Sequence, residues 1–199
     1  MPIIKEPVHE KKPNPLLEDL KPILPVIAAN AFQAEKDRSV PAENIALLKS
    51  IGMHRAFQPK PYGGMEISLP QFADCIALLA GACASTAWAM SLLCTHSHQL
   101  AMFPAKAQQE IWGDDPDATA SSSIAPFGRT EEVEGGVMFS GEMGWSSGCD
   151  HAEWAIVGFR RKKTPKAPRT IALRCCHAAT MRFAMTGSRW ACAAVAARR

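Results

Sequence analysis

The amino-acid sequence predicts an α+β protein in which helices come first and strands follow. Up to about residue 115, apolar residues recur at the three- and four-residue spacing of helices that bury one face. From about residue 118 onward they alternate with polar residues and are separated by glycines, as in strands. With 47% hydrophobic and 21% charged residues, the composition is that of a globular protein.

The first predicted helices occupy residues 16–36, where two prolines interrupt the helical pattern, and residues 40–51. Ser39 is expected to be the N-cap of the second segment, and Gly52 is expected to end it. The following stretch, PKPYGGMEIS, has the composition of a loop.

Residues 69–81 and 86–101 predict a pair of helices. Ser68 and Gln71 form the pattern of a capping box at the start of the first helix. The charge-free stretch 75–94 is long enough to cross a bilayer. Its many small residues and the break at GACAST favour a buried helical hairpin instead.

A short helix is predicted between Pro104 and Gly113, and strand patterns begin after it. ATASSSIAPF and EEVEGGVMFSGEM predict a hairpin that turns at Gly135-Gly136, and HAEWAIVGFR predicts an apolar strand. A sheet of only three or four strands has open edges and little core, so the sequence predicts an incomplete β-domain.

Acidic residues are absent from the last part of the chain. Residues 160–199 contain 11 of the 22 basic residues and no acidic ones, which leaves 11 basic and 19 acidic residues in residues 1–159, a net charge of −8. An acidic main body gives no reason to expect nucleic acid or a membrane surface as a partner.

Seven cysteines occur without a C-x-x-C pair, so neither a metal site nor a disulfide framework is expected. The first 15 residues, MPIIKEPVHEKKPNP, are charged and rich in proline, and they lack the apolar core of a signal peptide. A cytoplasmic protein is the expectation.

Two polar clusters are the candidates for chemistry, because the sequence has no phosphate-binding loop, dinucleotide fingerprint or nucleophile elbow. The first lies on the charge-free helix and comprises Trp88 and CTHSH at residues 94–98. The second comprises SSS at residues 121–123 and GWSSGCDH at residues 144–151. Each has a structural alternative, since a histidine can cap a helix, serines can lie at a strand edge, and tryptophans can belong to a core.

These clusters lie within segments that resemble a known family. LLKSIGMHRAFQPKPYGG is similar to a helix-and-loop signature of the acyl-CoA dehydrogenase superfamily. LAGACASTAWAMSLLCTHSHQLAMF, DPDATASSSIAPFGR and GWSSGCDHAEWAIVGF resemble one branch of it, the oxygenase components of two-component flavin monooxygenases that hydroxylate phenols. The resemblance covers roughly residues 39–159.

This resemblance implies N-terminal helices, a β-barrel-like middle domain and a C-terminal four-helix bundle, with the flavin between the β-domain and the bundle. The implied cofactor is reduced FMN or FAD, supplied by a separate flavin reductase, and O2 is the implied co-substrate. The implied reaction is ortho-hydroxylation of a phenolic small molecule through a flavin C4a-hydroperoxide, and the implied assembly is a homotetramer.

The same resemblance implies roles for seven residues. His96 is expected to hydrogen-bond the phenol. Ser147 is expected to face flavin N5, because it takes the position of a flavin-facing threonine in dehydrogenase relatives. The other implied substrate- or cofactor-binding residues are Trp88, Ser122, Ile124, Ser146 and Trp145.

The chemistry of these residue types fits the implied reaction. Ortho-hydroxylation requires an electron-rich phenol, and histidine is a base whose pKa lies near neutrality. A neutral hydroxyl such as that of Ser147 can hold flavin N5 in a dry pocket without adding a charge.

The basic tail has three interpretations: a nucleic-acid or membrane arm, a disordered solvating segment, and a frameshift. Lys162-Lys163-Thr164 is encoded by AAR-AAR-ACN, which can contain seven adenines, and reading the later codons one base earlier restores acidic residues and strand-like alternation. We therefore expect an out-of-frame, disordered tail at residues 162–199 in a truncated, inactive product that lacks the C-terminal four-helix bundle.

The expected organisation is an N-terminal extension with a first helix at residues 1–38, an acyl-CoA dehydrogenase-like helical domain at residues 39–115, the start of the middle β-domain at residues 116–161, and the tail. Two other functions stay open. One is an acyl-CoA dehydrogenase proper, whose catalytic glutamate would lie in the C-terminal bundle. The other is a binding module that uses the basic tail.

Overall fold

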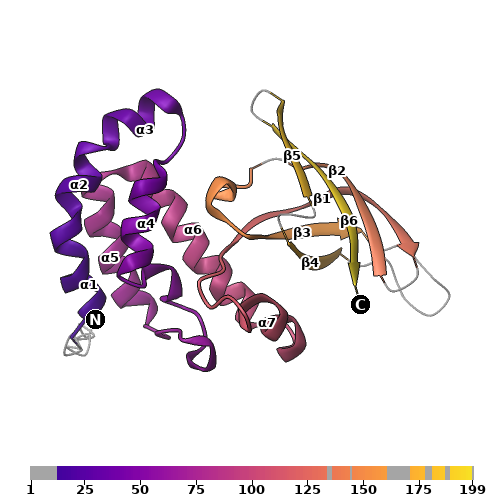
Figure 1. Ribbon diagram of the computed structural model, residues 1–199, viewed down its shortest axis with the longest axis horizontal. Coiled ribbons are helices and arrows are strands. Elements are labelled where there is room, and N and C mark those ends of the chain that lie inside the picture. Colours follow the sequence, from indigo (N-terminus) through magenta and orange to yellow (C-terminus); the bar gives the residue numbers. More distant parts are fainter. Residues whose placement is uncertain are drawn as a thin grey trace, which may run out of the picture.

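Helices and a sheet form two parts of the molecule that lie side by side (Figure 1). The computed structural model describes residues 13–133, 136–143, 145–160, 171–177, 181–186 and 189–198. Apart from one short turn, the described helices end by residue 112, and the described strands begin at residue 120. The predicted α+β fold, with helices first and strands second, is therefore confirmed.

The α-helices are short at first and longer toward the middle of the chain. They are α1 (Pro15–Leu20), α2 (Leu24–Ala29), α3 (Ala31–Asp37), α4 (Ala42–Ser50), α5 (Leu69–Ala82), α6 (Ala84–Ala101) and α7 (Ala105–Trp112), with the 3-10 turns η1 (Lys21–Ile23), η2 (Met53–Arg55) and η3 (Lys60–Tyr62). The predicted segment 16–36 is divided because Pro22 and Pro25 each lie in the first turn of a new helix, where the missing N–H is not needed.

The helix ends follow the predicted signals in part. α5 begins with the predicted capping box, in which the Ser68 hydroxyl accepts from the Gln71 N–H and the Gln71 side chain accepts from the Ser68 N–H. α4 differs, because Pro41 rather than Ser39 is its N-cap. The Ser39 N–H donates to the Ala34 carbonyl, so this serine closes the preceding helix instead.

α5 and α6 form the predicted hairpin at the centre of the helical part. Leu79, Met90 and Leu93 on these helices are fully buried, as are Leu48 and Met53 from α4 and η2. Burying one such side chain contributes about 1.5–3 kcal/mol, so this cluster fixes the position of α6. Within the residues that the structure describes, no helix is both long and apolar enough to span a membrane.

The described strands form one six-stranded sheet. They are β1 (Ala120–Val133), β2 (Gly136–Met143), β3 (Trp154–Arg160), β4 (Ile171–His177), β5 (Met181–Thr186) and β6 (Arg189–Arg198), in the order β4-β3-β1-β2-β6-β5. β1 and β3 pair in parallel, and all other neighbours are antiparallel. The predicted β1–β2 hairpin is confirmed, but Gly136 pairs with Val133 as part of β2. Gly135 lies outside the described residues.

The last three strands differ from the predicted disordered tail at residues 162–199. β4 pairs with β3 and β6 pairs with β2, so the edges of both predicted strands are covered. An open strand edge presents unpaired N–H and C=O groups, and a following segment with β-forming residues can satisfy them. Four of the nine basic residues at positions 162–199 precede β4 and therefore do not interrupt these strands.

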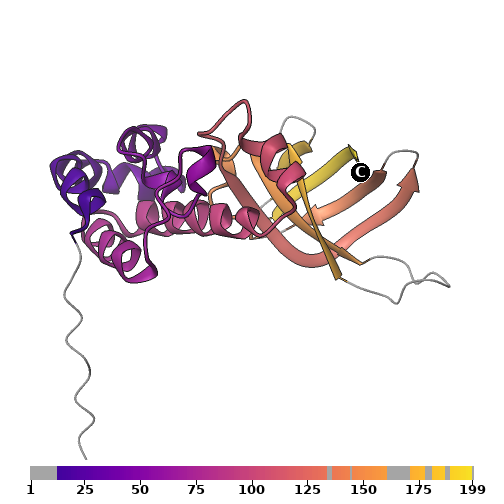
Figure 2. The same cartoon turned by 90° about the horizontal axis from the view of Figure 1, so that it is seen from below.

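The sheet is attached to the helical part along α6 and α7 (Figure 2). A second apolar cluster fills this junction and includes Leu100 of α6, Trp112 of α7 and Ile156 of β3. The Trp112 indole N–H donates to the Ala118 carbonyl at 3.1 Å, just before β1 begins. The junction therefore places the first residues of β1 beside the second half of α6.

Candidate active site

His96 lies on α6, and each of its ring nitrogens has a partner on β1. Nδ1 is 2.9 Å from the Ala120 carbonyl oxygen, and Nε2 is 2.8 Å from the Ser122 hydroxyl. A carbonyl oxygen can only accept, so Nδ1 carries the hydrogen. In the neutral ring Nε2 is then an acceptor, and the Ser122 hydroxyl donates to it.

The surroundings of His96 keep its ring neutral. The side chain is 8% exposed, and this burial lowers its pKa below the usual value of 6.5. The hydrogen bond to the Ala120 carbonyl acts in the opposite direction, but the effect of burial is larger and the pKa stays lowered. A neutral imidazole with an acceptor nitrogen is the form that can act as a base.

Ser122 reaches His96 because of the alternation along β1. Ser121 and Ser123 are buried, whereas Ser122, between them, is half-buried and turns its hydroxyl toward α6. The Ser121 hydroxyl accepts a hydrogen bond from the Ser146 hydroxyl at 3.0 Å. This bond connects β1 to the loop that precedes β3.

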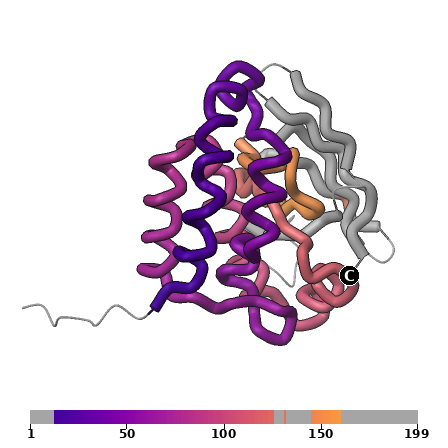
Figure 3. The backbone as a smooth tube through the Cα atoms, turned by 60° about the vertical axis from the view of Figure 1, so that its left-hand side comes forward, coloured from indigo at the N-terminus to yellow at the C-terminus, as the bar shows by residue number. Residues whose placement is uncertain are grey.

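That loop, residues 145–153, contains the short turn η4 (Cys149–His151) and lies against the helical part (Figure 3). Gly148 has a φ of +81°, and a Cβ at this position would lie 3.2 Å from the Leu93 side chain on α6. Glycine therefore permits both the left-handed backbone and the close approach to α6. Burial raises the pKa of the Cys149 thiol to about 11, so this cysteine is not a thiolate nucleophile at neutral pH.

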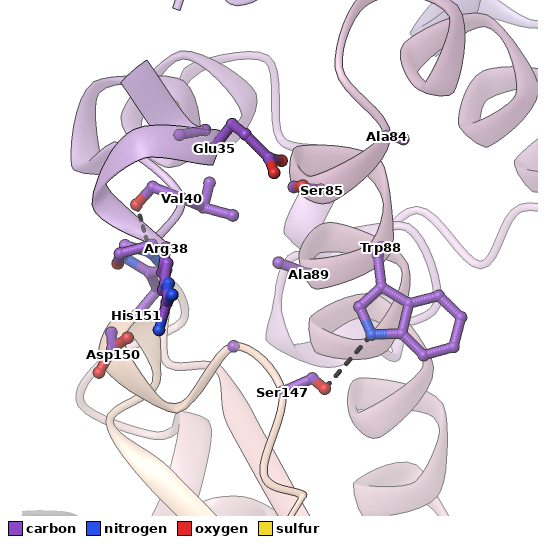
Figure 4. A pocket seen from close by; sticks show the side chains of 13 residues that line it. Glu35, Arg38, Val40, Ala84, Ser85, Trp88, Ala89, Ser147, Asp150 and His151 are labelled. Carbon is purple, nitrogen blue, oxygen red and sulfur yellow. Dashed lines mark hydrogen bonds between the residues drawn. The ribbon is translucent and has the colours of Figure 1, made fainter. Parts of the chain in front are cut away.

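The loop also brings Ser147 to Trp88. The Trp88 indole N–H donates to Ser147 Oγ at 3.3 Å (Figure 4). Trp88 is 64% exposed, so one wall of this part of the site is an open aromatic surface. Trp88 and His96 are both on α6, eight residues apart, or about 12 Å along the helix.

Five of the seven residues that the resemblance implies take part in side-chain hydrogen bonds. His96 pairs with Ser122, and Trp88 pairs with Ser147. Ser146 is buried and its hydroxyl donates to Ser121. Because Ser146 adjoins Ser147 and Ser121 adjoins Ser122, this bond connects the two pairs.

The other two residues, Ile124 and Trp145, are not part of these hydrogen bonds. Ile124 is 48% exposed and Trp145 is 95% exposed. Trp145 also has a φ of +63°, a left-handed conformation that is uncommon for a bulky side chain. Both side chains therefore present apolar surface to solvent.

An open pocket of about 610 Å³ adjoins the Trp88–Ser147 pair. α3 contributes Glu35 to its wall and Arg38 follows that helix, while the loop before β3 contributes Asp150 and His151 (Figure 4). The His151 Nε2 donates to the Val40 carbonyl at 3.0 Å and ties the loop to the helical part. The sequence did not predict this pocket, because its walls come from segments that lie far apart along the chain.

Sequence reasoning also missed Thr119, which directly precedes the Ala120 that contacts His96, and Glu153, which binds Thr119. The Glu153 carboxylate accepts from the Thr119 N–H at 2.7 Å and lies 3.1 Å from the Lys49 ammonium. A lone glutamate before a strand carries no motif, so nothing in the sequence distinguished it. Among the residues that the structure describes, no group of three or more His, Cys, Asp or Glu side chains is placed to hold a metal ion.

The side chains of the Trp88–Ser147 and His96–Ser122 pairs, with Ser121 and Ser146, fit one face of a flavin ring in their chemistry. The members of this set are an indole, hydroxyl groups and a neutral imidazole, and none of them carries a charge. The exposed aromatic surface of Trp88 suits a flat ring, and the Ser147 hydroxyl beside it suits a hydrogen-bonding ring edge.

The chain is similar to known proteins in sequence, although no family model matches it. The p-hydroxyphenylacetate 3-hydroxylase oxygenase component of Acinetobacter baumannii is 70% identical over 146 residues, which are 73% of this chain and 35% of that protein. The flavin-dependent monooxygenase oxygenase subunit HsaA of Rhodococcus jostii is 37% identical over 142 residues, which are 71% of this chain and 37% of that protein.

The structure is also similar to solved structures. The HsaA monooxygenase from M. tuberculosis superposes with a TM-score of 0.84 and 31% sequence identity, over 92% of this chain and 53% of that one. The chain spans about a third of the length of the curated relatives it matches. Over nearly three quarters of its residues, the chain is a homologue of the oxygenase components of flavin-dependent monooxygenases.

Proposed function

We propose that this chain carries part of the active site of a two-component aromatic hydroxylase, in the component that uses reduced flavin and O2 to hydroxylate a phenol beside its hydroxyl group. The observation that carries the proposal is the neutral His96, whose Nε2 accepts a hydrogen bond from Ser122. The names of the relatives, an oxygenase component and an oxygenase subunit, support the same class of reaction.

In this proposal His96 is the base toward the phenol. The Nδ1–H is committed to the Ala120 carbonyl, so Nε2 is the nitrogen that can accept the phenolic hydrogen. Drawing that hydrogen toward Nε2 makes the ring more electron-rich, as attack on an electrophilic oxygen requires. Ser122, the present donor to Nε2, is placed either to yield its position to the phenol or to hold the phenolic oxygen.

Trp88 and Ser147 are the proposed contacts to the flavin, as reduced FMN or FAD. When bound, the flavin supplies the electrons and activates O2 for transfer. The Trp88 N–H donates to Ser147 Oγ, which leaves the Ser147 hydroxyl hydrogen available for a second acceptor. Ile124 and Trp145 are proposed to exclude water at the margin, because both are apolar and exposed in this chain.

The proposal includes two protein partners. A separate reductase is required to supply reduced flavin, and the phrase "oxygenase component" in the name of the relative supports this division of work. Association of like chains, as a tetramer, is the second. The resemblance of residues 39–159 to this family is what supports it.

A chimera tests this function. The matching 146-residue segment of the Acinetobacter baumannii oxygenase component is replaced by that of this chain. With a flavin reductase, NADH, FMN and p-hydroxyphenylacetate, we expect a dihydroxylated product by chromatography. A folded chimera that binds reduced flavin but forms no hydroxylated product from any phenol contradicts the proposal.

The 199-residue chain alone is proposed to be inactive and to bind reduced flavin weakly, because the surfaces of Trp88 and Trp145 are open to solvent. Anaerobic titration of the chain with reduced FMN measures this. Stoichiometric binding at micromolar concentration, with hydroxylation of a phenol, contradicts it.

We further propose that the tail is read from a shifted frame beginning near Lys162. Its lack of acidic residues supports this, as does a sequence match to the curated relatives that extends over only 69–76% of the chain. Sequencing the gene across the codons for residues 158–170, in independent isolates, tests the idea. An uninterrupted frame without an adenine run contradicts it.

A further inference from the structure

Glu153 lies immediately before β3, and its carboxylate gathers hydrogen bonds from two separate parts of the chain. Oε2 is 2.7 Å from the Thr119 backbone nitrogen and 2.9 Å from the Thr119 hydroxyl. Oε1 is 3.1 Å from the Lys49 ammonium on α4. The carboxylate therefore joins the helical part, the entry to β1 and the entry to β3.

Thr119 is completely buried, and the turn before β3 holds its backbone and its side chain. Its carbonyl accepts from the backbone N–H groups of Glu153 and Trp154, at 3.1 and 3.0 Å. Its hydroxyl also lies 2.9 Å from the His151 carbonyl, so its single hydrogen is shared between that carbonyl and Glu153. The Thr119 N–H donates to the Glu153 carboxylate.

The next residue along the chain is Ala120, whose carbonyl accepts from His96 Nδ1. The Thr119 backbone therefore leads directly into the residue that fixes the histidine. If the Thr119 N–H loses its acceptor, the start of β1 can rotate, and the Ala120 carbonyl moves with it.

We propose that Glu153 is a positioning residue: by holding Thr119, it aims the Ala120 carbonyl at His96 and fixes the tautomer in which Nδ1 carries the hydrogen and Nε2 is the acceptor. The value of this tautomer for phenol activation rests on the proposed function. The positioning itself does not, because each contact lies within this chain.

A carboxylate suits this place better than other side chains. Three donors converge on it, namely the Thr119 N–H, the Thr119 hydroxyl and the Lys49 ammonium, and only an acceptor with two oxygens satisfies all of them. Glutamine keeps one oxygen but turns an NH2 group toward either Lys49 or Thr119. Alanine removes every acceptor and leaves a buried N–H unpaired.

Glu153 is ionised at neutral pH despite its partial burial. Burial by itself raises the pKa of this carboxyl, but the Thr119 N–H and the Lys49 charge together hold the pKa below its usual value of 4.5. The three donors therefore meet a carboxylate rather than a carboxylic acid.

The test is the tautomer of His96, observed by long-range ¹H–¹⁵N NMR on the ¹⁵N-histidine-labelled 199-residue chain. The chain has six histidines, and the His96 signals are those lost in His96→Gln. In the wild type we expect a protonated Nδ1 and an unprotonated Nε2. In Glu153→Ala we expect the Nε2–H tautomer to gain population, so the ¹⁵N shifts of Nδ1 and Nε2 should approach each other or, if that tautomer dominates, swap their values. In Glu153→Gln we expect a smaller change in the same direction.

Glu18→Gln is the matched control, because Glu18 is exposed on α1 and its described ion pair is with Lys21. It should leave the His96 shifts unchanged. If Glu153→Ala does not fold, Glu153→Gln decides. Wild-type His96 shifts in a folded Glu153→Gln and in any folded Glu153→Ala overturn the inference.

This outcome is separable from that of the proposed function, because the spectrum requires neither flavin nor phenol. A changed tautomer in the Glu153 variants, with no hydroxylation by the chimera, supports the positioning role and contradicts the function. An unchanged tautomer in the Glu153 variants, with an active chimera, supports the function and contradicts the positioning role.

Discussion

Replacing Gly158 by alanine should distort the sheet at the edge of the candidate site. Gly158 lies in β3 opposite a bulge in β1, where the pairing register shifts between Ser123 and Gly128. A Cβ on Gly158 would lie 1.9 Å from the Ile124 carbonyl oxygen and 2.7 Å from its carbon. Because these are backbone atoms, no side-chain rotation relieves the contact.

The magnitude follows from the distance that must be gained. Real Cβ atoms essentially never approach within 3.0 Å of another atom, so β1 or β3 has to move by about an ångström where the two strands pair. Overpacking of this kind costs about 1–3 kcal/mol, and a clash with backbone lies at the upper end. For a protein of this size, about 3 kcal/mol corresponds to a fall in Tm of about 6–12 °C.

Gly81→Ala is the control, because it makes the same chemical change in open space. Gly81 lies near the end of α5, and a Cβ at this position would have no atom within 4 Å. Alanine is the better helix former, so this variant should gain up to about 1 kcal/mol. Thermal unfolding followed by tryptophan fluorescence compares the two. A Gly158→Ala variant as stable as the wild type refutes this interpretation of the β1–β3 contact.

Two further predictions concern charge. Burial lowers the pKa of His54 and of His96 below the usual value of 6.5, although the hydrogen bond from the His54 ring to the Asp117 carboxylate acts in the opposite direction. The unfolded chain therefore binds more protons than the folded one below about pH 6.5. The free energy of unfolding should therefore decrease as the pH falls below about 6.5. In His54→Gln, the midpoint of urea unfolding should depend less on pH between about pH 7.5 and about pH 5. The same pH dependence as in the wild type contradicts this expectation. Lys49→Met breaks the ion pair with Glu153, in which both side chains are partly exposed, and should change stability by only about 0–1 kcal/mol in urea unfolding; a loss above about 2 kcal/mol contradicts this expectation.

The helical part could be predicted well because its signals are local. The capping box of Ser68 and Gln71 needs only a three-residue spacing. The helix from Ala105 to Trp112 lies between Pro104 and Gly113, the two residues that predicted its ends. His96 and Ser122 were identified by resemblance, and the structure brings them within 2.8 Å of each other.

What could not be predicted depends on contacts between distant residues. Lys49 and Glu153 are 104 positions apart, so their ion pair depends on how α4 packs against the turn before β3. No local sequence pattern predicts such a contact. The strands β4 to β6 were missed for a related reason, since pairing to an open edge is decided by the sheet and not by the composition of the added segment. The role of Gly158 is likewise set by Ile124, on another strand.

The most direct test of the central claim is His96→Asn in the chimera, measured beside His98→Asn. His98 lies on the same helix but is exposed and packs on Phe57, with ring centroids 5.8 Å apart. We predict that His96→Asn lowers the rate of phenol hydroxylation by about 10²- to 10⁴-fold while reduced-flavin binding is retained, and that His98→Asn changes the rate little. Hydroxylation at the same rate in His96→Asn as in the unaltered chimera contradicts the assignment of His96 as the base.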